Sequence, residues 1–308
     1  MTYSAGGLIQ AADFNAILNS NSPNFNSIWS TGAGSSGYGQ TAIGTVSAAA
    51  PVAASAWNSL ITNMAKSATH QGSTITTLTP PVAGNSIAYL AAIATNMTTL
   101  NTNRLNCAAV GTDITNSATR VAPWGSGQSI PTLTSIINVT FSNDAAARYF
   151  FNAGGSILLS ASNSGGAGGE DIAWNNLCTD IGTIGLPAVN TAQTLAAASY
   201  QGLTKFGGGG SAPTIYVRNG FYNLPTLTAT WFRQYSNYSV YTNDYIEIGY
   251  SYTGTGSVRM RMTFVDTSTF FANTVNGSLQ VTATARQPES TNIANSWGTP
   301  TVTVTAPA

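Results

Sequence analysis

Few side chains in this chain could carry out chemistry, and histidine is the scarcest of them. His70 is the single histidine of the 308 residues, so a Ser-His-Asp triad or a histidine metal site would have to include it. It stands at the end of an expected helix, where a ring commonly bonds to terminal carbonyl groups. Neither a cysteine nor a carboxylate lies at ligand spacing from it in the sequence. The sequence therefore predicts a structural role for His70.

The other candidate catalytic groups are two cysteines and a few carboxylates. Cys107 and Cys178 match no zinc or redox spacing, so both are expected to be buried free thiols. Glu170 or Asp171 could act with Asp180 as the two carboxylates that sugar hydrolysis requires. Acids that open a helix more commonly stabilise its N-terminus. The sequence predicts no enzyme, no catalytic residue, no metal site and no cofactor.

A glycine-rich stretch at residues 29–40 contains the formal pattern GxGxxG. Nucleotide binding would require a strand before the pattern, a helix after it and an acidic residue about 20 positions further on. Here a helix is expected before the glycines, and residues 52–60 contain no acid. We expect instead a loop packed by Trp29 and Tyr38.

The candidate contact surface lies in the aromatic run at residues 231–245. Tyr235, Tyr238 and Tyr241 are interspersed with Ser, Thr and Asn. A flat, amphipathic tyrosine ring suits stacking on sugars or a protein interface because it loses little entropy on binding. A pair of strands whose tyrosines pack on a sandwich would produce the same alternation. Both interpretations stay open at this point.

The chain is organised around the stretch at residues 140–162, which is predicted to be a structural joint. A short helix capped by Asn143 or Asp144 carries Arg148 and the adjacent aromatic residues Phe150 and Phe151. Gly154 and Gly155 then allow the positive φ that a reversal needs, before a buried strand begins. The residues of the predicted joint are Arg148, Phe150, Phe151, Gly154 and Gly155.

The regions before and after this stretch differ in kind. Residues 1–106 are expected to be helical, with an internal repeat in which residues 9–17 align with residues 52–60. Residues 107–308 are expected to be rich in β-structure and could divide near residue 200. The predicted fold class is α+β: a small helical N-terminal region followed by a mainly antiparallel sandwich or small barrel, with short helices.

Individual elements follow from hydrophobic periodicity. A helix is expected over residues 85–105, and another begins at Glu170 and Asp171. Residues 119–125 are expected to be an extended connector. The expected strands are residues 133–141, 213–217, 227–235, 244–252, 257–266, 279–286 and 301–305.

Composition excludes several classes of partner. Charged residues make up 6% of the chain, against about a quarter in ordinary soluble proteins. Ten basic and ten acidic residues give a net charge of zero, so neither nucleic acid nor an anionic membrane would attract the chain. No apolar run approaches the ~20 residues of a membrane span, so no membrane insertion is expected. The first residues lack the basic and apolar regions of a signal peptide.

Several short motifs occur together along the chain. They are ADFN at residues 12–15, GYGQ at 37–40, WNSL at 57–60, HQ at 70–71, ARYFFNAGG at 147–155, WNNL at 174–177 and IGT at 181–183. In this combination the chain resembles virion structural and tail-fibre-like proteins of tailed bacteriophages. A departure is residues 157–159, where three aliphatic residues replace the expected alternation with a charge. The resemblance implies a class and no catalytic residues.

Together, the composition and the resemblance predict a non-enzymatic virion component made in the host cytoplasm. It is expected in the tail, the neck or collar, or an attached fibre, as a symmetric oligomer of copies of itself in contact with other virion proteins. The alternatives are a host-receptor or carbohydrate-binding module of a tail fibre, and a capsid decoration or head-fibre protein. A surface glycan of the host is a possible further partner.

Overall fold

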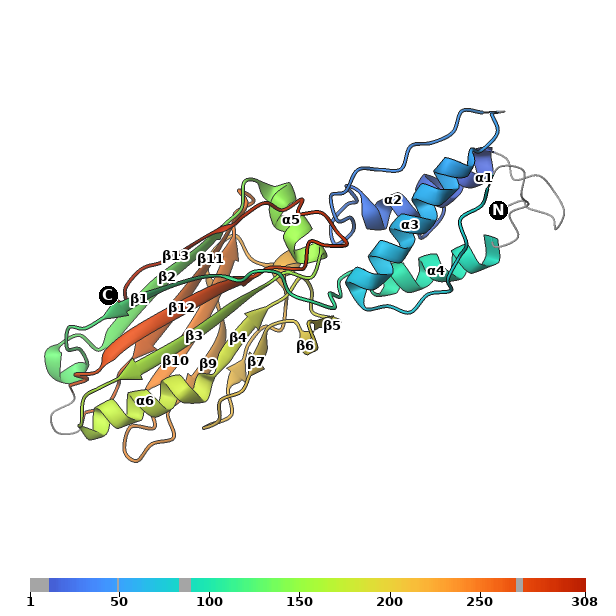
Figure 1. Cartoon of the computed structure of the whole chain (residues 1–308). Helices are drawn as coiled ribbons and strands as arrows, with labels where there is room; N and C mark the ends of the chain where they lie inside the picture. The colour runs from blue at the N-terminus through green and yellow to red at the C-terminus, as the bar shows by residue number, and fades with distance from the viewer. Residues whose placement is uncertain (1–10, 49, 83–89, 270–273) are drawn as a thin grey trace.

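The chain forms an elongated molecule with helices at one end and β-sheets at the other (Figure 1). A computed structural model describes residues 11–48, 50–82, 90–269 and 274–308. Residues 9–10 of the predicted repeat and residues 85–89 of the predicted helix lie outside these ranges. The predicted fold class, α+β with helices followed by antiparallel sheets, is confirmed.

The helical region is held together by apolar faces that the sequence spacing creates. In α3 (Ala54–Gln71), Trp57, Leu60 and Met64 are buried at helical spacing. Phe14 packs edge-on against Trp57, with ring centroids 4.9 Å apart, so the aromatic residues of the two predicted repeat segments contact each other. The other elements of this region are α1 (Ala11–Asn15), the π-helical turn η1 (Ala16–Ser20), α2 (Phe25–Trp29) and α4 (Leu90–Thr102).

The strands form two open antiparallel sheets. The five-stranded sheet has the order β1 (Ile114–Arg120), β12 (Ser278–Arg286), β3 (Ser156–Ser164), β4 (Thr183–Leu186) and β7 (Thr204–Phe206). The six-stranded sheet has the order β13 (Thr301–Val304), β2 (Thr132–Thr140), β11 (Ser257–Val265), β10 (Tyr245–Tyr252), β9 (Ala229–Tyr235) and β8 (Thr214–Ile215). A separate hairpin joins β5 (Ala192–Leu195) to β6 (Ala198–Gln201).

The core lies between the two sheets and follows the alternation of the strands. In β11 the residues with even numbers from Val258 to Phe264 are all buried, as the period-2 pattern predicts. They share one apolar cluster with Leu279 and Val281 of β12 in the other sheet. The alternative prediction of a small barrel is wrong, because each sheet keeps two unpaired edge strands instead of closing on itself.

Two helices accompany the sheets. α5 (Asp144–Asn152) lies at the end that faces the helical region, whereas α6 (Gly169–Ile181) begins at the opposite end and packs along β3 (Figure 1). Asn143 caps α5 by accepting a hydrogen bond from the N–H of Ala146 at 2.9 Å, as the sequence predicts. The short 3₁₀ turns are η2 (Ser126–Gln128) and η3 (Phe221–Asn223).

Hydrophobic periodicity does not predict some of the strands. β1 lies where no strand is predicted, since its sequence ITNSATR is polar and mostly solvent-facing on a sheet edge. The strands β4 to β7 are only three or four residues long, too short for a period to emerge. The apolar core runs continuously from the helices into the sheets. The boundaries near residues 106 and 200 stay predictions.

Candidate functional site

The stretch predicted to be a joint lies where the helices meet the sheets. Arg148 Nη2 donates to the carbonyl oxygen of Gly32 at 2.7 Å, and Asn152 Nδ2 donates to that of Gly37 at 2.9 Å. The loop at residues 31–37 therefore presents carbonyl oxygens to α5. A phosphate cradle would present N–H groups instead, so the loop has the wrong polarity for a nucleotide. We call this contact between α5 and residues 31–37, together with the reversal at Gly154 and Gly155 that follows α5, the joint.

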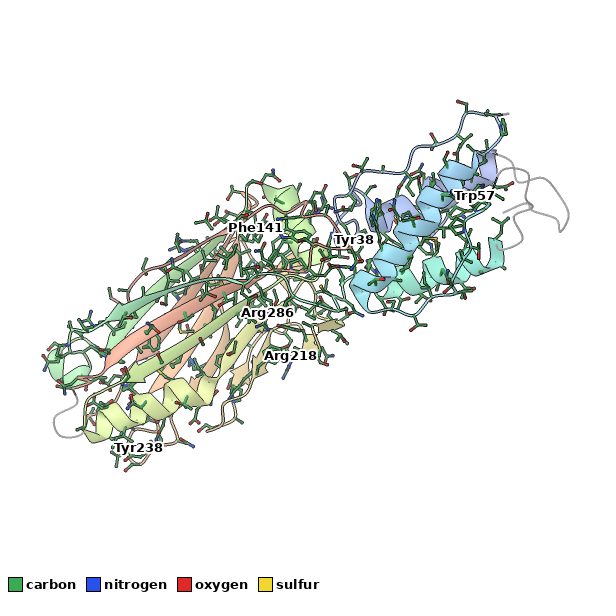
Figure 2. The ribbon with its side chains drawn as sticks, viewed as in Figure 1. Tyr38, Trp57, Phe141, Arg218, Tyr238 and Arg286 are labelled. Carbon is green, nitrogen blue, oxygen red and sulfur yellow. The ribbon has the colours of Figure 1, made fainter. Side chains whose placement is uncertain are left out.

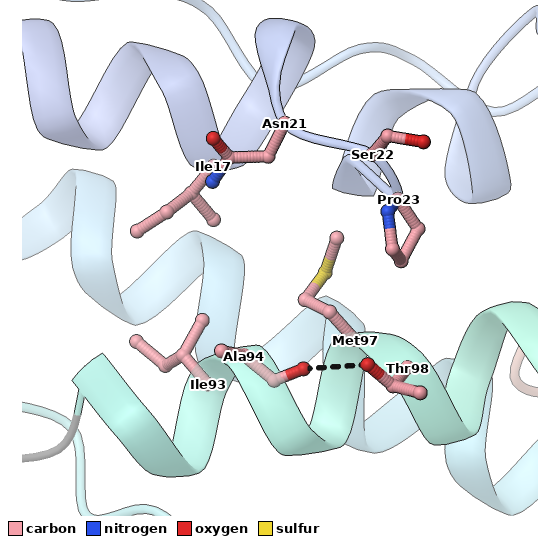
Figure 3. A pocket seen from close by; sticks show the side chains of 8 residues that line it. All are labelled: Ile17, Asn21, Ser22, Pro23, Ile93, Ala94, Met97 and Thr98. Carbon is pink, nitrogen blue, oxygen red and sulfur yellow. Dashed lines mark hydrogen bonds between the residues drawn. The ribbon is translucent and has the colours of Figure 1, made fainter. Parts of the chain in front are cut away.

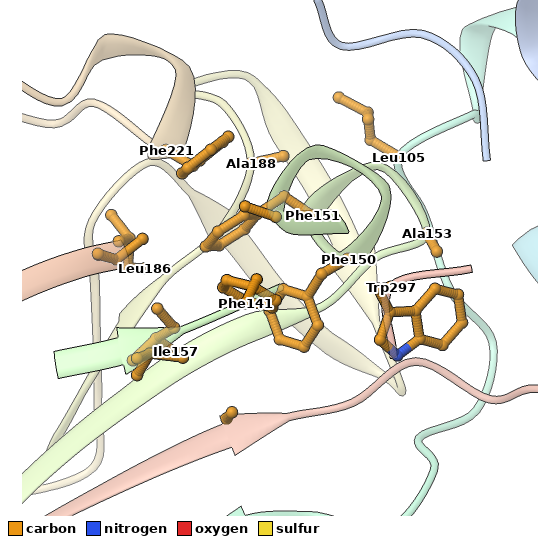
Figure 4. Packing of buried hydrophobic residues seen from close by; sticks show 14 of the residues in the cluster. Leu105, Phe141, Phe150, Phe151, Ala153, Ile157, Leu186, Ala188, Phe221 and Trp297 are labelled. Atoms are coloured by element: carbon orange, nitrogen blue, oxygen red, sulfur yellow. The ribbon is translucent and has the colours of Figure 1, made fainter. Parts of the chain in front are cut away.

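Phe150 and Phe151 form the apolar centre beneath the joint (Figure 4). Phe150 packs against Phe141 with ring centroids 4.9 Å apart. Phe151 stacks on Phe221 at 4.3 Å with an interplanar angle of 12°. All four rings are buried, so they tie α5 to β2 and to the η3 turn through apolar packing.

The two glycines of the joint allow a close approach that no other residue would permit. Gly154 has a φ of 88°, and a Cβ built on it would lie 2.5 Å from the Cβ of Cys107. A Cβ on Gly155 would lie 2.6 Å from a ring carbon of Phe150. The reversal after α5 is therefore packed against both the aromatic centre and the chain that leaves the helical region.

His70 has a structural role at the same interface, with a partner that sequence spacing does not reveal. Its Nε2 lies 2.9 Å from the carbonyl oxygen of Ala153, and its Nδ1 lies 2.6 Å from Glu289 Oε1. Burial would raise the pKa of Glu289, but hydrogen bonds from His70 and from the N–H groups of Asn292 and Thr291 outweigh burial and lower the pKa to about 2.

Cys107 lies near this pair without the features of a nucleophile. Burial raises the pKa of its thiol to about 11, and the Sγ donates to the carbonyl oxygen of Ala109. A catalytic cysteine requires the opposite shift, since the thiolate is the reactive form. Cys178 is also a buried free thiol, so both cysteines are as the sequence predicts.

The candidate tyrosines divide into two groups. Tyr238 and Tyr241 stack on each other at 6.4 Å with an interplanar angle of 9°, in the connection between β9 and β10. Tyr238 lies at the end of the molecule farthest from the helices (Figure 2). Tyr235 belongs instead to the strand β9, where it faces Tyr245 of β10 and accepts a hydrogen bond from Arg233. The three tyrosines therefore belong to two different aromatic pairs.

The carboxylates considered for sugar hydrolysis are separated from one another. Asp171 caps α6 by accepting from the N–H of Gly168, and it also accepts from the N–H groups of Asn276 and Gly277. Asp180, near the other end of α6, lies against the glycine-rich loop that follows β7. Glu170 is buried and lies against Trp174 and Ser268, which are not partners of Asp171 or Asp180.

Glu170 lies close to two carboxylates that are far from it in the sequence. Carboxyl oxygens of Glu170, Asp244 and Asp266 all lie within 4.8 Å of one another. The three residues are 2%, 1% and 2% exposed, respectively. Burial, strengthened by the nearby Asp266 and Asp244, raises the pKa of Glu170 to about 8. We call this group the carboxyl cluster.

The carboxyl cluster and the stacked tyrosines are neighbours. Burial and the negative charge of Glu170 and Asp244 raise the pKa of the Tyr241 hydroxyl. The Cβ that an alanine would place at Gly169 would lie 3.1 Å from the Tyr241 hydroxyl oxygen, so this ring covers the start of α6. We call the start of α6, the β9–β10 connection and the end of β11 the distal tip.

A signal in the sequence could have found two members of the cluster. Asp244 directly precedes β10 and Asp266 directly follows β11. Because β10 and β11 pair with Tyr245 opposite Val265, the two aspartates must face each other across the hairpin ends. The approach of Glu170 depends on how α6 packs, which no local pattern specifies.

A small hollow lies at the other end of the molecule. It has a volume of about 230 Å³ and separates the η1–α2 connection from α4 (Figure 3). Its lining is mixed: Ile17, Ile93 and Met97 contribute apolar side chains, Asn21, Ser22 and Thr98 contribute polar ones, and no charged residue contributes. It offers no group for chemistry.

Comparisons with protein-family models, with curated proteins and with solved structures gave no match for this chain. Within the described ranges, none of the helices has the length and apolar character needed to cross a membrane.

Proposed function

We propose that this protein is a non-enzymatic structural component of a bacteriophage virion, assembled with copies of itself in the tail, the neck or an attached fibre. The observation that carries the proposal is the near absence of charge: ten basic and ten acidic residues in 308, with a net charge of zero. Copies without net charge do not repel one another, which favours dense packing in a particle. The motif resemblance to phage virion proteins points to the same class.

The geometry of the reactive groups supports a role without catalysis. The carboxyl cluster is too buried for a sugar ring to contact it. The raised pKa of the Cys107 thiol opposes nucleophilic attack. The elongated shape supports a structural role, since the helical end and the distal tip can contact different neighbours (Figure 1).

Immunogold electron microscopy of purified particles tests this proposal. Antibodies raised against the recombinant chain should label the tail, the neck or a fibre of the phage whose genome encodes it. Mass spectrometry of the same particles should detect the chain in several copies per virion. Absence of the chain from purified, infectious particles would refute the proposal.

A second candidate function, binding of a host surface glycan, is favoured by the stacked pair Tyr238 and Tyr241. Both rings are partly exposed at the distal tip, and parallel aromatic rings provide a flat apolar platform for sugar rings. In an attached fibre, the end farthest from the attachment point would meet the host first.

A glycan array probed with the full-length protein tests this second function. The double variant Tyr238→Ala, Tyr241→Ala should lose the bound glycans, while Tyr235→Ala is the matched control because Tyr235 belongs to the other aromatic group. Binding that survives the double variant would refute the assigned face. Binding lost equally in Tyr235→Ala would also contradict it.

A further inference from the structure

The carboxyl cluster brings three negative groups into the interior without a basic partner. All ten Lys and Arg residues of the chain lie in the described ranges, and none of the ion pairs found there includes Glu170, Asp244 or Asp266. Carboxylates this close repel each other strongly in a medium of low dielectric constant. The buried charge must therefore be balanced by protons or by a cation that the chain itself does not supply.

The hydrogen bonds at the carboxyl cluster leave acceptor capacity unused. Asp266 accepts from the N–H groups of Ser126 at 2.6 Å and Ser268 at 3.0 Å. Glu170 Oε1 accepts from the indole N–H of Trp174 at 3.1 Å. The Ser268 hydroxyl lies within hydrogen-bonding distance of both Glu170 and Asp266, but it has one proton for two acceptors.

The shortage of hydrogen-bond donors is clearest at Asp244. Its Oδ1 accepts from the N–H of Thr267 at 2.8 Å, while its buried Oδ2 has no hydrogen-bond partner among the described residues. The Thr267 hydroxyl lies 3.5 Å from the same Oδ1, and the remaining side chains that act on this carboxyl are those of Glu170 and Asp266. When ionised, these two carboxylates can only accept, so they offer Oδ2 no donor. An almost completely buried oxygen that faces other acceptors is the arrangement that a cation would satisfy.

We propose that Glu170, Asp244 and Asp266 bind a divalent cation, and that this cation is Ca²⁺. The oxygens lie within 4.8 Å of one another, and ligands on opposite sides of a Ca²⁺ ion at about 2.4 Å each are separated by about that distance. The donor set contains oxygen only, which suits a hard cation and not zinc or copper. The proposal does not depend on the virion role.

The cation would connect three segments that are far apart in the chain. Glu170 lies in the first turn of α6, Asp244 precedes β10 and Asp266 follows β11. Binding would therefore fix α6 against the ends of the β10–β11 hairpin. The connection that carries Tyr238 and Tyr241 ends at Asp244, so the same ion would also hold the stacked tyrosines in place.

Tryptophan-sensitised luminescence of Tb³⁺, a Ca²⁺ surrogate, tests the site in the full-length protein after treatment with a chelator. Trp174 donates directly to Glu170, so its excitation should transfer to a bound Tb³⁺. We expect one Tb³⁺ per chain, displaced by Ca²⁺. We also expect Ca²⁺ to raise the thermal unfolding midpoint by several degrees relative to chelator, since a ligand that binds only the folded state stabilises it.

Asp244→Asn removes one ligand charge with little change in shape, and Glu170→Gln is a second variant should the first fail to fold. Either variant should lose the Tb³⁺ signal and the Ca²⁺-dependent shift. Asp113→Asn is the matched control, because Asp113 is a partly exposed carboxylate that pairs with Arg286 away from the cluster. Absence of both effects in the folded wild-type protein would overturn the proposal. Undiminished Tb³⁺ binding in Asp244→Asn would also overturn it.

Discussion

The joint and the distal tip both bury polar side chains, but they differ in whether every buried polar atom has a hydrogen-bond partner among the described residues. At the joint, Asn152 donates to carbonyl groups of the glycine-rich loop, and its Oδ1 lies 2.7 Å from the Tyr222 hydroxyl. Nearby, both ring nitrogens of His70 face oxygen acceptors. At the tip, Asp244 Oδ2 has no donor among the described residues.

This difference separates a structural contact from a binding site. A network in which every buried polar atom has a hydrogen-bond partner fixes the position of its members and needs no ligand. A buried group that lacks a partner costs folding free energy, and a ligand can recover that cost. The two regions therefore respond differently to substitution: changes at the joint lower stability, whereas changes at the tip alter binding.

The largest loss of folding stability is expected for Gly154→Val at the joint. The new side chain would adopt an unfavourable positive φ and collide with Cys107, which together should cost about 2–5 kcal/mol of unfolding free energy. Gly207→Val is the control, because Gly207 also has a positive φ but has no atom within 4 Å of its Cβ position. That variant should lose only about 1–2 kcal/mol. Equal losses in urea unfolding would contradict close packing at Gly154.

Much of the β-structure, and the start of α5, can be predicted from the sequence because these features depend on local patterns. Alternation in β11 and the Asn143 cap of α5 are both read directly from neighbouring residues. The partner of His70 is not, because Glu289 is 219 positions away and approaches only once β12 is in place. The same holds for Glu170, whose cluster depends on the packing of α6. Buried polar contacts between distant segments leave no period in the sequence.

Acid should weaken the contact between His70 and Glu289. The folded protein holds the pKa of Glu289 at about 2, below its ordinary value of about 4.3 in an unfolded chain. Folding therefore favours the ionised form. The resulting stabilisation, about 3 kcal/mol, is fully present above pH 4.3 and is lost as the pH falls through 2.

Urea unfolding of wild type and Glu289→Gln at pH 7 and at pH 3 measures this contribution. The variant should be less stable at pH 7, and the difference should shrink at pH 3. Asp113→Asn removes a carboxylate from a partly exposed pair, so it should show a small difference at both values. A gap between wild type and Glu289→Gln that does not change with pH would show that the ionised carboxylate contributes nothing.

The smallest losses of stability are expected when one tyrosine hydroxyl is removed in each of the two regions. The Tyr222 hydroxyl lies 2.7 Å from both the Gly34 carbonyl oxygen and Asn152 Oδ1, and burial raises its pKa to about 12. Tyr222→Phe should therefore cost about 1 kcal/mol of unfolding free energy, since it leaves Asn152 without a donor.

Tyr241→Phe should change the unfolding free energy by less than about 0.5 kcal/mol, because its partly exposed ring keeps its stacking on Tyr238. Thermal or urea unfolding of the two variants measures both values. Because each variant removes one hydroxyl from one tyrosine, a difference between them reports the surroundings and not the residue type. An equal loss in both would mean that the tip is as tightly matched as the joint, and the contrast between the two regions would fail.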